Sequence, residues 1–298
     1  MGDADESWEL AEGDALAPGR TVMRLLGGGS RYEAFLVWDE RLYALAVAKA
    51  LRPHLAQDDR ALRELRDEAD AVGRLAHPVI VRGFDAVLDG PRPHLLLEHL
   101  EGPNLRRLIR RHGSVPLEQL LPLAAHIAAG LHYMAGEEMV HLDVKPDNIV
   151  MGVPPRLIDL SIARSIERAA NVRAAIGTDA YMAPEQCRAP GAPPLGPATD
   201  VWGLGATLHH AVTGDVPFPR AADARESHDP AVRFPQLSEP PTELPRDLPQ
   251  TLAEAISRCL AKRPADRPSA ADLVSLVEPA IAELPRRLLF GRRGTRTR

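Results

Sequence analysis

The eight residues from His141 to Asn148 constrain this chain more than any other stretch of its sequence. Within that short loop, Asp143, Lys145 and Asn148 can bring a carboxylate, an ammonium and an amide close to one another. A further carboxylate, Asp159, follows sixteen positions after Asp143, behind apolar residues that suit a short strand. Two acidic side chains and an amide predict a divalent cation with oxygen ligands, and Mg²⁺ fits that preference.

A glycine run earlier in the chain points to phosphates. Gly27, Gly28 and Gly29 stand between two apparent strands, and Lys49 follows inside an apolar strand. Backbone that can approach phosphates, followed by a fixed ammonium, is what nucleotide binding needs. Each feature alone has a simpler explanation, because three glycines usually form a turn and a lysine in a strand usually faces solvent. Their order and spacing together favour a nucleotide site.

Hydrophobic periodicity divides the chain into two parts. Strands are predicted within residues 20–51 and 79–100, with a charged helix over 58–75 between them. From about Asn104 onward the pattern becomes helical. Helices are predicted near 117–135, 198–213, 251–262 and 270–284. We therefore predict an α+β fold in which a small strand-rich lobe precedes a larger helical one.

Composition excludes several classes of protein. The chain has 298 residues of which 45% are hydrophobic, the proportion of a globular protein. Its formal net charge of −5 gives no electrostatic reason to expect nucleic-acid binding. Cys187 and Cys259 form no CxxC pair, so neither a disulfide framework nor a zinc site is expected.

The two ends of the chain carry opposite charge. The first 14 residues hold six acids and no base, and the last 20 hold six arginines against one glutamate. Both ends are predicted to be solvated arms, although Trp8 could pack on the small lobe. The uncharged stretch Gln119–Gly136 has the length of a short membrane span, but its proline and histidines favour a buried helix. We expect a cytoplasmic protein, with membrane association through the basic tail as the less favoured alternative.

The ordered series of motifs resembles the bacterial, eukaryotic-like serine/threonine protein kinases over roughly residues 20–275. The motifs are Leu26 to Gly29, Ala46 to Lys49, His141 to Asn148, Leu157 to Ser161, Gly177-Thr178 with Tyr181 to Glu185, Asp200 to Gly205, and Pro264 to Pro268. Small-molecule phosphotransferases share the His-x-Asp loop but lack Ala183-Pro184-Glu185, so this segment favours a protein substrate. The resemblance implies a two-lobed kinase fold with an acidic arm over 1–19, an N-lobe over 20–100, a C-lobe over 101–278 and a basic tail over 279–298.

The resemblance also implies roles for single residues, with ATP and Mg²⁺ as cofactors. Asp143 would accept or orient the proton of the substrate hydroxyl, and Lys145 would steady the γ-phosphate. Lys49 would contact the α- and β-phosphates and pair with Glu68. The metal ligands would be Asn148 and Asp159, and the nucleotide pocket would comprise Leu26, Gly27, Gly28, Gly29, Ala34, Val47, Lys49, Leu97, Glu98, Leu100 and Val150. Supporting residues would be Asp200 beneath the catalytic loop and the buried pair of Glu185 and Arg267.

Four positions depart from the family pattern. Tyr32 stands where the third loop glycine is expected and should limit how closely the loop covers the phosphates. Val47 replaces a small alanine above the adenine, which narrows the pocket, and Leu142 replaces the arginine before Asp143. Ser161 replaces a glycine after the magnesium aspartate, and a serine at a positive φ there would cost about 1 kcal/mol.

The missing arginine has a counterpart in the activation loop. In the family this arginine pairs with a phosphate on that loop, whereas here residues 160–176 contain Ser161 and Ser165 and no threonine or tyrosine. We therefore predict an activation segment held by packing instead of phosphorylation. The predicted function is a kinase that transfers the γ-phosphate of ATP to serine or threonine hydroxyls of protein substrates. The alternative is a pseudokinase that binds nucleotide or acts as a scaffold.

Overall fold

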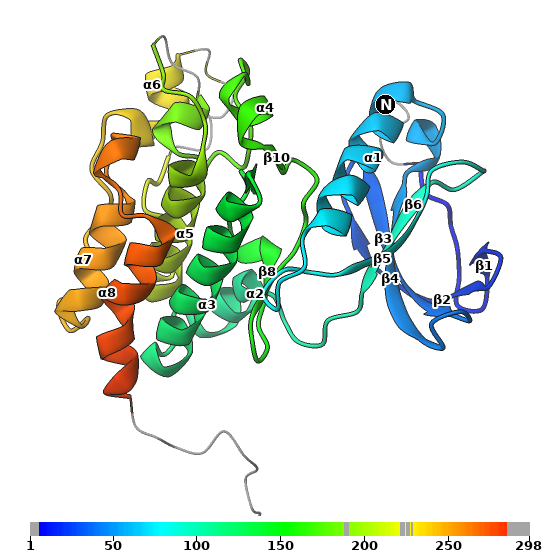
Figure 1. The fold of residues 1–298 in the computed structure, drawn as a ribbon, viewed down its shortest axis with the longest axis horizontal. Coiled ribbons are helices and arrows are strands. Elements are labelled where there is room, and N and C mark those ends of the chain that lie inside the picture. The colour runs from blue at the N-terminus through cyan, green and yellow to red at the C-terminus, as the bar shows by residue number, and fades with distance from the viewer. Residues whose placement is uncertain (1–5, 188–190, 221–223, 225–226, 228, 285–298) are drawn as a thin grey trace, which may run out of the picture.

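Two lobes of unequal size lie side by side along the longest axis of the computed structural model (Figure 1). The structure describes residues 6–187, 191–220, 224, 227 and 229–284. The N-lobe contains a six-stranded sheet and one long helix, and the C-lobe contains the other helices. The predicted α+β architecture of two lobes is confirmed.

The N-lobe sheet is antiparallel, with the strand order β1-β2-β3-β4-β6-β5. Its strands are β1 Ala15–Ala17, β2 Arg20–Gly28, β3 Tyr32–Asp39, β4 Ala44–Leu51, β5 Gly83–Val87 and β6 His94–Glu98. On β4, alternation buries Ala46, Ala48 and Ala50 on one face of the sheet and turns Val47 and Lys49 to the other. The lysine is thereby directed away from the packed alanine face.

Helix α1 (Asp59–Arg74) packs on the sheet and carries a buried carboxylate. It begins after Asp58, whose side chain accepts a hydrogen bond from the Ala61 backbone N–H. Leu65 and Val72 lie on its apolar face, and Glu68 is buried on the same side of the helix at 1% exposure. The helix therefore presents one acidic side chain to the interior of the N-lobe.

The predicted solvated arm is wrong for the described part of the N-terminus. Trp8 donates its indole N–H to the Leu51 carbonyl oxygen over 2.7 Å, and Leu10 packs on the outer face of the sheet. Leu16, in β1, is 1% exposed. The six acids favoured a solvated arm, but the apolar residues Trp8, Leu10 and Leu16 hold this segment against the N-lobe. Residues 1–5 lie outside the described part.

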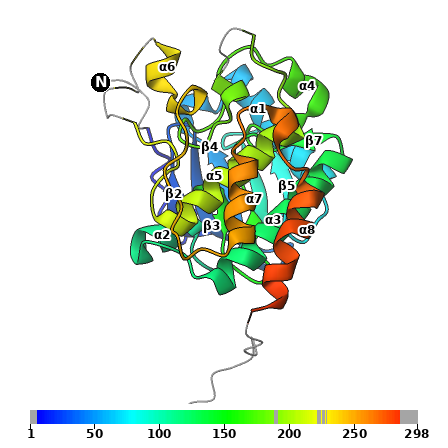
Figure 2. The same cartoon turned by 90° about the vertical axis from the view of Figure 1, so that its left-hand side faces the viewer.

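The C-lobe is built on the long helix α3. Its helices are α2 Leu105–His112, α3 Leu117–Gly136, α4 Ile166–Ala170, α5 Pro197–Thr213, α6 Pro230–Arg233, α7 Gln250–Cys259 and α8 Ala270–Ala282. Seen from the C-lobe end, α7 and α8 lie in front of α5 and α3 (Figure 2). The stretch Gln119–Gly136 belongs to α3, whose buried residues join the main core, as predicted for a buried helix. Among the described helices, none is long and apolar enough to cross a bilayer.

Short strands fix the loop that carries most of the predicted site. They are β7 Met139–Val140, β8 Ile149–Val150, β9 Arg156–Leu157 and β10 Arg164–Ser165, paired as β8 with β9 and β10 with β7. The loop from His141 to Asn148 therefore begins directly after one strand and ends directly before another. The predicted basic tail over 279–298 overlaps the last turn of α8, and its residues 285–298 lie outside the described part.

Candidate active site

A carboxylate from helix α5 holds the backbone of the catalytic loop. Asp200 accepts hydrogen bonds from the backbone N–H groups of His141 and Leu142, each over 2.7 Å. Burial raises the pKa of Asp200. Leu142 has a φ of 66°, a backbone conformation that costs energy in any residue other than glycine. Such a conformation persists only where the surrounding contacts hold the backbone in place. The structure thus places Asp200 beneath the loop.

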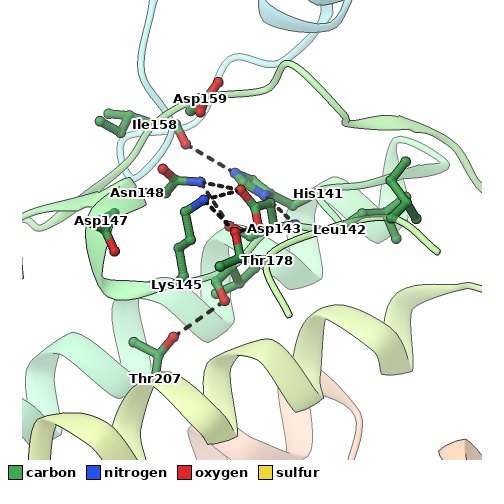
Figure 3. A network of polar contacts seen from close by, with 12 residues as sticks. His141, Leu142, Asp143, Lys145, Asp147, Asn148, Ile158, Asp159, Thr178 and Thr207 are labelled. Atoms are coloured by element: carbon green, nitrogen blue, oxygen red, sulfur yellow. Dashed lines mark hydrogen bonds and ion pairs between the residues drawn. The ribbon is translucent and has the colours of Figure 1, made fainter. Parts of the chain in front are cut away.

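Asp143, Lys145 and Thr178 form a closed triangle of hydrogen bonds (Figure 3). The Lys145 Nζ atom lies 2.6 Å from Asp143 Oδ2 and 2.7 Å from Thr178 Oγ1, and the threonine hydroxyl donates to Asp143 Oδ1 over 2.8 Å. Asn148 donates its side-chain N–H₂ to the carboxylate and the carbonyl oxygen of Asp143, over 3.1 and 3.0 Å. Within the described residues its Oδ1 accepts no hydrogen bond, so this oxygen is available to a ligand.

Lys49 joins two carboxylates from different parts of the chain. Its Nζ atom lies 2.8 and 2.9 Å from the Glu68 oxygens and 2.7 Å from Asp159 Oδ1. Burial opposes the lysine charge, but Glu68 and Asp159 outweigh it and raise the pKa of Lys49 above its usual range. Burial also opposes the charge of Asp159, but the ammonium holds the pKa of that carboxyl below its usual range. One ammonium thus links β4, α1 and the segment after β9.

The predicted strain at Ser161 is wrong. Asp159 itself has a positive φ, of 64°, and Ser161 is not among the described residues with a positive φ. The serine therefore needs none of glycine's conformational freedom. Burial raises the pKa of Asp159, Lys49 lowers it, and a hydrogen bond from the Ser161 side chain lowers it further. This substitution stabilises the aspartate anion.

The predicted phosphate loop is the hairpin between β2 and β3. A Cβ atom on Gly28 would stand 2.7 Å from the Tyr32 carbonyl oxygen, so this position needs glycine. Gly29 donates its backbone N–H to the same oxygen over 3.0 Å. The Tyr32 ring lies 4.5 Å from Lys49 Nζ, measured to its centroid. In the sheet register Gly27 and Ala34 are paired, Ala34 is also paired with Lys49, and Leu26 is 42% exposed.

The other predicted pocket residues line the junction between the lobes. Val47 on β4 is paired with Leu97 on β6, which is 9% exposed. Glu98 forms an ion pair with an arginine on β9, and its backbone N–H donates to the Arg82 carbonyl oxygen over 2.8 Å. The Leu100 backbone N–H has no acceptor among the described residues, so it can donate to a ligand. Val150 on β8 bridges to the segment just before α2.

These groups fit ATP and Mg²⁺. The free Asn148 Oδ1 and the partly exposed Asp159 carboxylate are oxygen donors of the kind Mg²⁺ prefers, and Mg²⁺ bound with phosphates needs only one or two protein ligands. In the described part of the chain, no cluster of three or more histidine, cysteine, aspartate or glutamate side chains offers another metal site. The free Leu100 N–H is a donor suited to the edge of a base.

The segment from Gly177 to Gln186, here called the platform, lies beside the triangle, and the sequence indicated only some of the groups that anchor it. Glu185 and Arg267 form the predicted pair, over 2.6 and 2.8 Å, with neither side chain exposed. Gln186, which was not predicted, donates to the carbonyl oxygens of Leu142 and Ile176, each over 2.8 Å. It ties the platform to the catalytic loop. In the sequence, only its position directly after Ala183-Pro184-Glu185 could have suggested that Gln186 belongs to the site.

A second missed group is the network of Tyr181, His210 and Arg106. The Tyr181 hydroxyl lies 2.6 Å from His210 Nδ1, and the Arg106 guanidinium lies 3.2 Å from that hydroxyl and 3.1 Å from His210 Nε2. Burial, followed by the charge of Arg106, lowers the pKa of His210 to about 4. A neutral histidine therefore supports the platform from α5. A double histidine in a helix gave no indication of this role.

Comparison with known proteins decides the family. A family model described as protein kinase domain matches residues 20–276. The chain belongs to the protein kinase domain family. The serine/threonine-protein kinase PknB of Mycobacterium leprae is 32% identical over 203 residues, which are 65% of this chain and 32% of that protein. The probable serine/threonine-protein kinase PkwA of Thermomonospora curvata is 34% identical over 238 residues, 77% of this chain and 31% of that protein.

This kinase domain spans about a third of the length of the curated relatives it matches. The predicted resemblance to bacterial serine/threonine kinases is confirmed, and so is the two-lobed kinase fold. The departures at Tyr32, Val47, Leu142 and Ser161 leave in place every polar side chain that the family motifs assign to phosphate, metal or substrate hydroxyl.

Proposed function

We propose that this kinase domain transfers the γ-phosphate of ATP to serine or threonine hydroxyls of protein substrates. The observation that carries the proposal is that both halves of the site are assembled together. Lys49 contacts Glu68 and Asp159, while Asp143 is held by Lys145 and by Thr178. Phosphoryl transfer depends chiefly on positioning and charge neutralisation, and an assembled site supplies both.

Each side chain has a task that its surroundings support. Asp143, fixed from two sides, would accept the proton of the substrate hydroxyl as the oxygen attacks the γ-phosphorus and the bond from that phosphorus to ADP breaks. Lys145, 2.6 Å from that carboxylate, would neutralise charge on the transferred group. Lys49 would orient the remaining phosphates. Mg²⁺ bound by Asn148 and Asp159 would neutralise phosphate charge.

The protein substrate is proposed from the platform. Thr178 lies within hydrogen-bond distance of both Lys145 and Asp143, so it borders the place where a substrate hydroxyl would sit. Gly177 has a φ of 116°, and a Cβ atom there would stand 2.9 Å from Gln186 Nε2. The segment is therefore packed directly on the catalytic loop. A segment held in this way could support an extended substrate peptide beside Asp143.

We further propose that the activation segment is active without phosphate. Leu142, at 3% exposure, belongs to an apolar cluster with Ala169 of α4. Partly buried residues around this cluster are Ile162, Ile166, Val172 and Ile176. Ser165 caps α4, because its Oγ accepts a hydrogen bond from the Arg168 backbone N–H over 3.2 Å. These apolar contacts support an activation segment that is held without the phosphate and arginine used in the family.

The alternative of a pseudokinase is favoured by one observation. The Tyr32 ring stands against Lys49, in the region where the family places phosphates. In that case the chain would bind nucleotide weakly or without turnover.

Transfer of ³²P from labelled ATP to a generic basic protein tests the two functions, with Asp143→Asn as the matched control. We expect label to be incorporated by the wild type and lost in the variant. Equal labelling by both would disprove catalysis, and a thermal shift with ATP and Mg²⁺ but no labelling would support the pseudokinase. Phosphatase treatment and Ser165→Ala should leave the rate unchanged. Loss of activity in both would contradict phosphate independence.

A further inference from the structure

Residues Glu6–Leu10, here called the N-terminal strap, are bound to the phosphate-loop hairpin through Glu33. The Ser7 hydroxyl donates to Glu33 Oε1 over 2.6 Å, and the Trp8 backbone N–H donates to Oε2 over 3.0 Å. Glu33 is 2% exposed and lies on β3, between Tyr32 and Ala34. The strap therefore donates two hydrogen bonds to this buried carboxylate, and the Arg52 guanidinium lies 3.8 Å from its Oε1 atom.

A second link runs through Arg52, just after β4. Its Nε–H donates to the carbonyl oxygen of Gly29 at the hairpin tip over 2.5 Å, and its Nη1 donates to the Glu6 carbonyl oxygen over 3.0 Å. Its backbone N–H donates to the Arg31 carbonyl oxygen over 2.9 Å. One residue thus holds both the strap and the turn that would cover the phosphates.

Trp8 anchors the strap to the rest of the lobe. Its indole N–H donates to the Leu51 carbonyl oxygen, and its ring packs on the apolar outer face of the sheet. The Arg92 guanidinium lies 5.3 Å from the ring centroid, within the range of a cation–π contact. Leu51 directly precedes Arg52, so the anchor and the second link are adjacent in the chain.

The strap lies on the face of the hairpin opposite the nucleotide side. Side chains alternate across a strand, and the Tyr32 ring lies against Lys49, so Glu33 points to the other face. The strap therefore supports the hairpin from behind. It does not occupy the space that the predicted site assigns to phosphates.

We propose that the N-terminal strap is a positioning device that holds the hairpin in place for the ATP phosphates, acting through Glu33 and Arg52. This inference rests on the proposed function. A hairpin without the strap has to be ordered when the nucleotide binds, and ordering the freed side chains reduces the free energy gained on binding. With the strap bound, the hairpin is already ordered in the folded protein before the nucleotide arrives. The strap should therefore strengthen binding of the phosphates and leave binding of the base unchanged.

Titration calorimetry on the full chain, with Mg-ATP and separately with adenosine, tests this inference. Trp8→Ala and Glu33→Ala should each weaken ATP binding about tenfold, which corresponds to about 1.4 kcal/mol. Adenosine lacks phosphates, so its Kd should change less than about twofold by the same reasoning. Glu33→Gln keeps an acceptor oxygen and should recover part of the loss. Trp38→Ala, a half-buried aromatic on the far end of β3, is the matched control and should change neither Kd.

Trp8→Phe guards against simple misfolding, because it keeps an aromatic ring while it loses the indole N–H and part of the ring surface. It should weaken ATP binding less than Trp8→Ala while leaving the thermal unfolding temperature close to that of the wild type. Unchanged or tighter ATP binding in Trp8→Ala and Glu33→Ala, or an equal loss of ATP and adenosine binding, would overturn the inference alone. Absence of ATP binding in the wild type would overturn the proposed function together with it.

Discussion

Arg267 and Glu185 are joined by two hydrogen bonds, 2.6 and 2.8 Å long, and neither side chain is exposed to solvent. The arginine comes from the segment before α8 and the glutamate from the platform, 82 positions earlier. Arg267 also donates to the carbonyl oxygen of Ala198 at the start of α5. This pair therefore connects the substrate platform to the helical core.

Arg267→Ala should lower the free energy of unfolding by about 3–5 kcal/mol, because it removes one partner of a buried ion pair. Urea unfolding of the purified chain measures this loss. The double variant Glu185→Leu with Arg267→Met removes both charges and should recover at least about half of it. If the double variant were no more stable than Arg267→Ala, the loss in Arg267→Ala would not come from an unpaired buried charge, and this explanation would be wrong.

Ser161→Gly should fail to stabilise the kinase domain. The family pattern places glycine here, but the positive φ belongs to Asp159, so the new glycine would relieve no strain and would increase the freedom of the unfolded chain. We expect a loss of about 0.5–1 kcal/mol in the free energy of unfolding. Ser161→Ala, which also lacks the hydroxyl but not the Cβ, is the control. A gain in stability for glycine over alanine would contradict the observed backbone conformation.

His210 should make the domain less stable in mild acid. Its pKa in the folded protein is lowered from 6.5 to about 4, so the unfolded chain binds more protons between these two values. Stability is therefore lost as the pH falls below 6.5, and the loss is complete below about 4. Between pH 7 and pH 5 this amounts to about 2 kcal/mol.

His210→Gln should remove that part of the pH dependence when urea unfolding is compared at pH 7 and pH 5. His126→Gln, at an exposed position of α3, is the matched control. The idea fails if His210→Gln and the wild type lose the same stability over this range.

The sequence predicted the polar residues of the catalytic loop because they lie within eight positions of one another. Asp143, Lys145 and Asn148 converge as their spacing indicated. More distant partners, such as Asp159, were placed by the order of the motifs and not by any local rule. The lobes were predictable for a similar reason, since the long strands precede about residue 100 and most of the helical periodicity follows it.

What the sequence did not predict depends on contacts between distant segments. Nothing near Ser7 indicates that its hydroxyl meets Glu33, 26 positions later, and the acids around Trp8 favoured a solvated arm. Nor does the sequence near Ser161 indicate that the positive φ belongs to Asp159. Torsions and buried polar pairs of this kind are fixed by packing that a one-dimensional pattern does not contain.

The activation segment offers a direct comparison of packing with charge. Leu142 is buried against α4, whereas Arg168 and Asp67 form an ion pair, 2.7 Å long, in which the side chains are 61% and 45% exposed. Leu142→Ala should lower the free energy of unfolding by about 2–4 kcal/mol through the cavity it leaves. Arg168→Ala should cost less than about 1 kcal/mol, because exposed ion pairs contribute little and are screened by salt. Urea unfolding at low and high salt measures both, with initial rates of ³²P transfer recorded alongside. If Arg168→Ala proved the more damaging variant, by stability or by rate, the segment would be held by charge and the proposal of packing would be wrong.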